Sequence, residues 1–140
     1  MARGTRENVP LERQIHLGVA QLLMLTAAPG VVWTHVANER RATPREGAFL
    51  KRMGVRPGWA DFTLLLPPSL SWYGPQVAFL ELKRPGGRLS VAQEQFRDDV
   101  TAIGCLWALA FSTDRAAEIL KSWGALRSIT PTSMGKEEAA

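Results

Sequence analysis

Three charged residues in this 140-residue chain have the types and spacing needed to bind a cation and act beside it. Asp61 opens an apolar segment, and Glu81 and Lys83 stand near the end of another. Side chains alternate between the two faces of a strand, so Glu81 and Lys83 point the same way if residues 77–83 form a strand. That face begins apolar and ends charged. The pattern is typical of a core strand that carries charges to one end of a sheet.

These residue types suit a hard divalent cation. If the strand that begins at Asp61 pairs with the strand that ends at Lys83, the carboxylates of Asp61 and Glu81 can meet on one ion. Two carboxylates, a backbone carbonyl and water are ligands that Mg²⁺ or Mn²⁺ accepts. Such an ion polarises a phosphoryl oxygen, and a neighbouring ammonium group can orient water or stabilise charge on phosphate. Each charge alone is explained as well by a turn or a protected edge strand; together they favour a metal-dependent nuclease.

The segments around these residues resemble a known nuclease family. Residues 53–61 read Met-Gly-Val-Arg-Pro-Gly-Trp-Ala-Asp, residues 81–85 read Glu-Leu-Lys-Arg-Pro, and residues 89–93 read Leu-Ser-Val-Ala-Gln. An Asp followed further along by Glu-x-Lys resembles the signature of the PD-(D/E)xK nuclease superfamily. The flanking motifs resemble the virus-type replication-repair nuclease (VRR-NUC) domain, from about Glu12 to Trp123.

The resemblance implies a fold and a set of metal ligands. The fold is α/β, with a restriction-endonuclease-like α-β-β-β-α-β core in which helices flank a mixed central sheet. The metal ligands are Asp61, Glu81 and the backbone carbonyl of Leu82, and Lys83 is catalytic.

Two further polar residues are predicted at the same site. Glu12 lies on the face of the first helix that carries its apolar stripe, where a carboxylate is costly unless it meets a cation. The alternative is that Glu12 is a first-turn glutamate stabilised by the helix dipole. The resemblance places Gln93 beside the metal, and the alternative is an ordinary exposed glutamine. His35 is left open between a DNA contact, support of the site and a structural role, and His16 is assigned no catalytic role.

The predicted elements place these residues at strand ends and helix starts. A first helix is expected from an N-cap at Asn8 to the stop at residues 28–30. Ser or Thr at the N-cap and glycine after the last turn predict the later helices. Segments rich in apolar and β-branched residues predict the strands. The predicted helices span residues 44–53, 90–103 and 113–123, and the predicted strands span residues 31–36, 61–66, 77–83 and 105–111. The continuous apolar run of residues 105–111 favours a central, fully covered strand.

Composition limits the class of protein. The length fits one domain, expected over residues 1–128 with a flexible tail at residues 129–140. The single cysteine, Cys105, excludes an internal disulfide and a cysteine-based zinc site. The chain shows no signal peptide and no apolar run long enough for a membrane span, so a cytoplasmic protein in a bacterial or phage-infected cell is expected.

A net charge of +4 favours polyanionic partners. The expected function is a Mg²⁺- or Mn²⁺-dependent DNA endonuclease for branched or structured DNA, resolving four-way (Holliday) junctions in DNA repair as a homodimer without an organic cofactor. A flap or single-strand nuclease, a nicking enzyme, an RNA-directed nuclease and a non-catalytic DNA-binding module of the same fold remain alternatives. The residues predicted to contact nucleic acid are Arg84, Arg88, Arg56 and Arg41.

Overall fold

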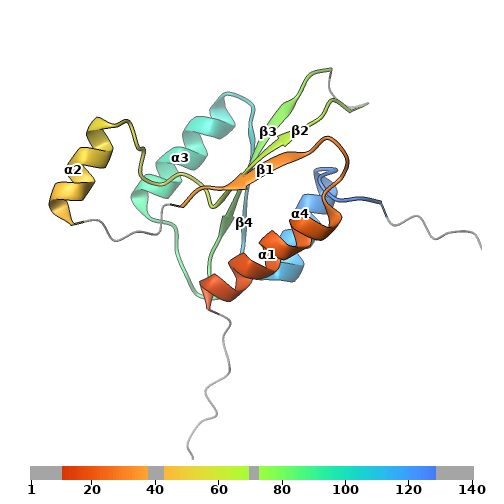
Figure 1. The fold of residues 1–140 in the computed structure, drawn as a ribbon, viewed down its shortest axis with the longest axis horizontal. Coiled ribbons are helices and arrows are strands. Elements are labelled where there is room, and N and C mark those ends of the chain that lie inside the picture. The colour runs from red at the N-terminus through yellow and green to blue at the C-terminus, as the bar shows by residue number, and fades with distance from the viewer. Residues whose placement is uncertain (1–10, 38–42, 70–72, 129–140) are drawn as a thin grey trace, which may run out of the picture.

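The chain folds around a four-stranded mixed sheet in a computed structural model that describes residues 11–37, 43–69 and 73–128 (Figure 1). The helices are α1 (Glu12–Thr26), α2 (Pro44–Arg52), α3 (Val91–Ala102) and α4 (Thr113–Ser122). The strands are β1 (Val32–His35), β2 (Phe62–Leu66), β3 (Gln76–Leu82) and β4 (Leu106–Ala110). The sheet order is β1-β2-β3-β4, with antiparallel pairing up to β3 and a parallel β3–β4 pair. The predicted α/β class and core order are confirmed.

Hydroxyl side chains set the starts of three helices. The side chains of Thr43, Ser90 and Ser112 each accept a hydrogen bond from a backbone N–H in the first turn of α2, α3 and α4, respectively. These bonds satisfy donors that the helix itself leaves without a partner. The helix α1 begins at Glu12, and the predicted N-cap Asn8 lies outside the described residues.

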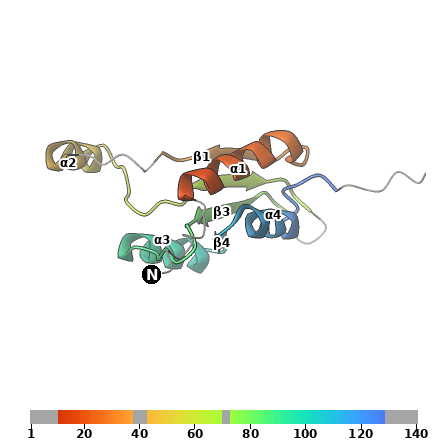
Figure 2. The same cartoon turned by 90° about the horizontal axis from the view of Figure 1, so that it is seen from below.

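Helices cover both faces of the sheet. The larger core joins α1 and α4 to one face through residues such as Val19, Leu80 and Leu120, all fully buried. The smaller core joins α3 to the other face through Phe79 and Phe96. Figure 2 shows α1 and α3 separated by the strands, and α2 standing apart from them. Within the described residues, no helix is long and apolar enough to cross a membrane.

The position of β4 corrects one prediction. β4 lies at the edge of the sheet beside β3, and all but its last residue are only half-buried. The predicted central position is therefore wrong, and β3 is the strand whose second half is fully buried. The apolar run of β4 has another cause: α3 and α4 both pack against this strand. Such a run reports that both faces of a strand are covered, not that both of its edges are paired.

Candidate active site

Three carboxylates meet at one end of the sheet. Antiparallel pairing sets Phe62 opposite Leu80, which brings Asp61, just before β2, close to Glu81 near the end of β3. Glu12, the first residue of α1, joins them, and one carboxylate oxygen from each of the three residues lies within 4.8 Å of the others. The predicted pairing of the two strands is confirmed, and the structure brings Glu12 to the same place.

Glu81 is the buried member of this group. Its side chain is 3% exposed, and its Oε1 atom accepts a hydrogen bond from Gln93 Nε2 at 2.8 Å. Burial, followed by the charge of Asp61, raises the pKa of Glu81 to about 8, although the Lys83 ammonium, 3.9 Å from Oε1, lowers it. A carboxylate in this setting favours a proton or a cation beside it. The three acidic side chains therefore fit a divalent ion.

Asp61 is held by the backbone on two sides. The N–H of Leu82 donates to Asp61 Oδ2 at 2.7 Å, which fixes the carboxylate against β3. The Asp61 carbonyl accepts from the N–H of Val36 at 2.9 Å and contacts His35 Nδ1 at 2.8 Å, which ties the residue to the end of β1. Metal ligation by the carbonyl of Leu82 stays a prediction.

The amide of Gln93 is oriented by the start of α3. Gln93 Oε1 accepts from the N–H of Ser90 at 2.8 Å, and the N–H of Gln93 donates to Ser90 Oγ at 3.1 Å. This reciprocal cap uses the amide oxygen, so the amide nitrogen faces Glu81. Gln93 is therefore part of the site and not an ordinary exposed glutamine.

Gly58, in the segment of residues 53–61 that leads to β2, allows α3 to approach the loop before β2. Gly58 has a φ of +83°, and a Cβ there would lie 2.3 Å from the carbonyl oxygen of Ala92. Both the backbone conformation and the close contact require glycine. This contact holds the first turn of α3, which carries Gln93, against the segment that leads to Asp61.

A tight turn follows the lysine. The N–H of Gly87 donates to the carbonyl of Arg84 at 2.9 Å, and Gly86 has a φ of +81°. Proline before a glycine of positive φ is typical of a type II turn. The turn leaves Lys83 15% exposed beside Glu81.

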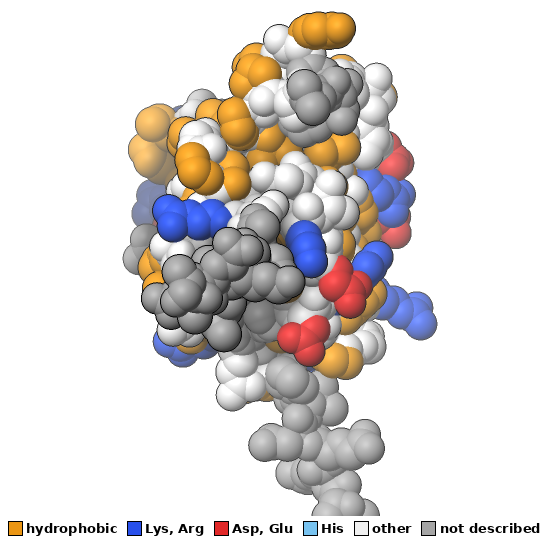
Figure 3. Space-filling view, turned by 90° about the vertical axis from the view of Figure 1, so that its right-hand side faces the viewer, with side chains coloured by type: hydrophobic (Ala, Val, Ile, Leu, Met, Phe, Trp, Pro, Cys, Tyr) orange, Lys and Arg blue, Asp and Glu red, His pale blue; other side chains and the backbone are white. Residues whose placement is uncertain are grey.

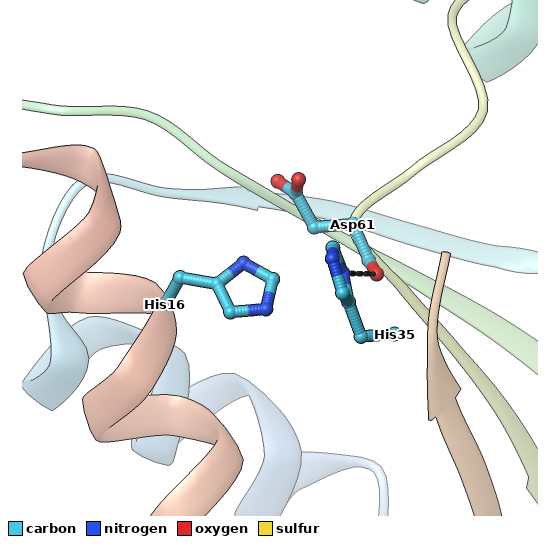
Figure 4. Close-up of side chains that lie close together, drawn as sticks. All are labelled: His16, His35 and Asp61. Atoms are coloured by element: carbon cyan, nitrogen blue, oxygen red, sulfur yellow. Dashed lines mark hydrogen bonds between the residues drawn. The ribbon is translucent and has the colours of Figure 1, made fainter. Parts of the chain in front are cut away.

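A second cluster shares Asp61 with the first. His16 on α1, His35 at the end of β1 and Asp61 each offer a ligand atom within 4.8 Å of the other two (Figure 4). His16 was assigned no role from the sequence. Its position nevertheless indicated that it lies near the site, because His16 follows Glu12 by one helical turn and is therefore on the same face of α1.

The arginines predicted to contact nucleic acid differ in their settings. Arg84 and Arg88 are exposed on the loop after β3, close in sequence to Lys83. Arg56 pairs with Asp99 and lies 5.6 Å from the centre of the Phe96 ring, so its charge already fastens the loop to α3. Arg41 lies outside the described residues. Contact of these arginines with nucleic acid stays a prediction.

An acidic residue before one strand and Glu-x-Lys at the end of its antiparallel neighbour, on a mixed α/β sheet, define a domain of the PD-(D/E)xK nuclease class. The chain belongs to the VRR-NUC domain family, whose sequence model matches residues 6–114. This finding confirms the predicted family and implies a nuclease of the PD-(D/E)xK type. Comparisons with curated proteins and with solved structures gave no match.

Proposed function

We propose that the chain is a DNA endonuclease that uses Mg²⁺ or Mn²⁺. The observation that carries the proposal is the meeting of Glu12, Asp61 and Glu81 beside Lys83, in a domain of a nuclease family. Together, the acidic oxygens form a hard, anionic donor set, and the raised pKa of Glu81 supports the proposal, because a nearby cation would offset the burial and the neighbouring negative charge that raise it.

The residues of the site have different proposed roles. Asp61 and Glu81, assisted by Glu12, would hold the cation, which when bound would polarise a phosphodiester oxygen and acidify water. Lys83 places its ammonium beside Glu81, where it orients the attacking water or stabilises charge on the phosphate. Gln93 donates to Glu81 Oε1 and so orients the carboxylate that would hold the ion.

The proposed substrate is branched or structured DNA, with a four-way junction as the leading form. Arg84 and Arg88 follow the site directly and are exposed, so they supply phosphate contacts that fix the DNA without reading its sequence. At the opposite end of the sheet, the face visible in Figure 3, Lys and Arg side chains lie beside Asp and Glu side chains. Positive charge is therefore not gathered into one track among the described residues visible there.

The proposed assembly is a homodimer. Each copy is proposed to form one domain over residues 1–128, followed by a tail of residues 129–140, which lie outside the described residues. A four-way junction presents two equivalent strands, and two copies related by a twofold axis would present one site to each. The helix α2 has no buried residue and exposes Phe49 and Leu50, with Met53 and Val55 just after it. This apolar surface is the proposed contact between the two copies.

The test is a cleavage assay over a four-way junction, a flap, a single strand, a nicked duplex and a linear duplex. We expect cleavage with Mn²⁺ or Mg²⁺, none with EDTA, and the highest rate on the junction. Faster cleavage of the flap or the single strand would mean that this form, and not the junction, is the preferred substrate. Binding of junction DNA without cleavage under any metal would favour a non-catalytic module.

A further inference from the structure

We propose that His16, His35 and Asp61 form a second metal site, which takes a transition ion such as Mn²⁺, Co²⁺ or Zn²⁺ beside the carboxylate site. Imidazole nitrogens suit these ions, whereas Mg²⁺ prefers oxygen ligands. The contribution of this ion to DNA cleavage rests on the proposed function, but its binding does not.

The three side chains come from three elements that converge at the end of the sheet (Figure 4). One ligand atom from each lies within 4.8 Å of the others, and all three residues are half-buried. The rings of His16 and His35 meet edge to face, with centroids 4.0 Å apart, and His16 stacks on Phe62 at 4.6 Å. Packing against buried Phe62 therefore fixes the imidazoles before any ion binds.

The hydrogen bond of His35 selects its metal-binding nitrogen. His35 Nδ1 lies 2.8 Å from the carbonyl oxygen of Asp61. A carbonyl oxygen only accepts, so Nδ1 carries the hydrogen and Nε2 of the neutral ring keeps its lone pair. Histidines that bind metals commonly donate their other nitrogen to a backbone carbonyl in this way. His35 is thus oriented as a ligand through Nε2.

A second cation would give the site a net positive charge. With all three carboxylates ionised, Glu12, Asp61 and Glu81 carry −3 and Lys83 carries +1, which leaves −2 at the site. One divalent ion brings this sum to zero. A second ion, held by neutral imidazoles and by the shared Asp61, brings it to +2 and so favours an anionic phosphodiester.

The histidine site can be reached from the surface. His16 and His35 line a groove of about 320 Å³ between α1 and β1, together with Arg13 and Trp33. Arg13 is exposed on the rim of this groove, where its charge favours a phosphate next to the ion.

The histidine content of the chain makes the test specific. His16 and His35 are its only histidines, so in a chain without a histidine tag an imidazole signal on bound Mn²⁺ comes from these two residues. Pulsed electron paramagnetic resonance detects the ¹⁴N coupling of such ligands. His16→Phe keeps a ring against Phe62, and His35→Asn keeps a donor for the Asp61 carbonyl, while each removes one ligand. Circular dichroism confirms that the variants fold.

We expect ¹⁴N coupling in the wild-type chain, weaker coupling in each single variant and none in the double variant. The Mn²⁺ stoichiometry should fall from two ions to one in the double variant. Glu81→Gln, which changes only the carboxylate site, should keep the coupling. Absence of ¹⁴N coupling at saturating Mn²⁺ would overturn the histidine site, even if Mg²⁺ supports cleavage. Coupling in a chain that cleaves no DNA would support the metal site and contradict the proposed nuclease.

Discussion

Glu81 is placed where a carboxylate is hard to keep charged. Its side chain is buried, and the carboxylates of Asp61 and Glu12 lie close by. The ammonium of Lys83 and the amide N–H of Gln93 offset part of the cost of keeping Glu81 charged. Glu81 should therefore lose its proton when a cation binds beside it. This exchange should have a measurable effect on the free energy of unfolding.

Without metal, the free energy of unfolding should fall as the pH rises from about 4.5 to about 8. The pKa of Glu81 is raised to about 8 in the folded chain, so the folded state binds this proton more tightly than the unfolded state, and the advantage is lost as the proton leaves. The loss attributable to Glu81 is at most about 4 kcal/mol. Denaturant unfolding in EDTA measures it as the difference between the wild type and Glu81→Gln. Saturating Mg²⁺ should restore stability at pH 8, and identical pH profiles for the two proteins would contradict the account.

Gln93 should act as a positioning residue for Glu81. Gln93→Ala removes the donor to Glu81 Oε1 and one of the two hydrogen bonds of the reciprocal cap with Ser90, so we expect the cleavage rate to fall by about 10–100-fold. The apparent affinity for Mn²⁺, measured by titration calorimetry, should fall with it, which a loss of the helix cap alone would not cause. Gln95→Ala is the matched control, because Gln95 lies on the same helix and bonds exposed Asp99. Equal effects of the two substitutions would contradict a special role for Gln93.

At the scale of elements, local signals predicted most of the fold. Hydroxyl caps at Ser90 and Thr43 form bonds within their own first turns, so the sequence is enough to locate those helix starts. Asp61 and Glu81 were expected to meet if their two strands pair, and the structure shows that β2 and β3 do pair, in antiparallel orientation. The edge position of β4 was not predicted, because an apolar run reports covered faces and does not report which edges are paired.

Contacts between distant segments explain the remaining differences. Arg56 is still predicted to contact nucleic acid, and its pairing with Asp99 on α3 is a contact that the sequence did not indicate. The meeting of His16 with His35 depends on how α1 packs across β1, and no local pattern encodes that contact. The carboxylate group was easier to predict, because Asp61 directly precedes β2 and Glu81 lies on the adjacent strand β3.

The contact between the Gly58 loop and α3 should matter for both stability and activity. Gly58→Ala introduces a methyl group 2.3 Å from the Ala92 carbonyl, in addition to the strain of a positive φ. Gly54→Ala is the control, because Gly54 has a φ of +88° with no atom within 4 Å of the added Cβ. We expect Gly54→Ala to cost about 1–2 kcal/mol and Gly58→Ala to cost clearly more in thermal or denaturant unfolding. Gly58→Ala should also lower the cleavage rate through Gln93. Equal costs would mean that the contact with α3 carries no energy.

At the scale of the whole molecule, the domain has a body and an outlying helix. The sheet with α1, α3 and α4 holds the buried cores and the site, whereas α2 stands apart with no buried residue (Figure 1). The exposed apolar side chains on this helix and just after it favour a contact with a partner; they are Phe49, Leu50, Met53 and Val55.

The proposed homodimer should therefore depend on α2. Light scattering should give twice the 15.4 kDa of one chain, and Phe49→Glu combined with Met53→Glu should shift it to the monomer mass. Ile103→Glu is the control, because Ile103 is an exposed apolar residue at the end of α3. If the wild-type chain has the mass of a monomer at assay concentrations, the proposed homodimer is wrong, while the proposed metal site is unaffected.

The most direct test of the central claim is metal-dependent cleavage by site variants. Glu81→Ala and Lys83→Ala are compared with Glu94→Ala, which removes an exposed carboxylate from the first turn of α3, next to Gln93. The account predicts that the wild type and Glu94→Ala cleave junction DNA with Mn²⁺ at similar rates. It predicts that Glu81→Ala and Lys83→Ala lose at least about 100-fold in rate, as expected when a group that stabilises the transition state is removed. Full Mn²⁺-dependent cleavage by either of these two variants would contradict it.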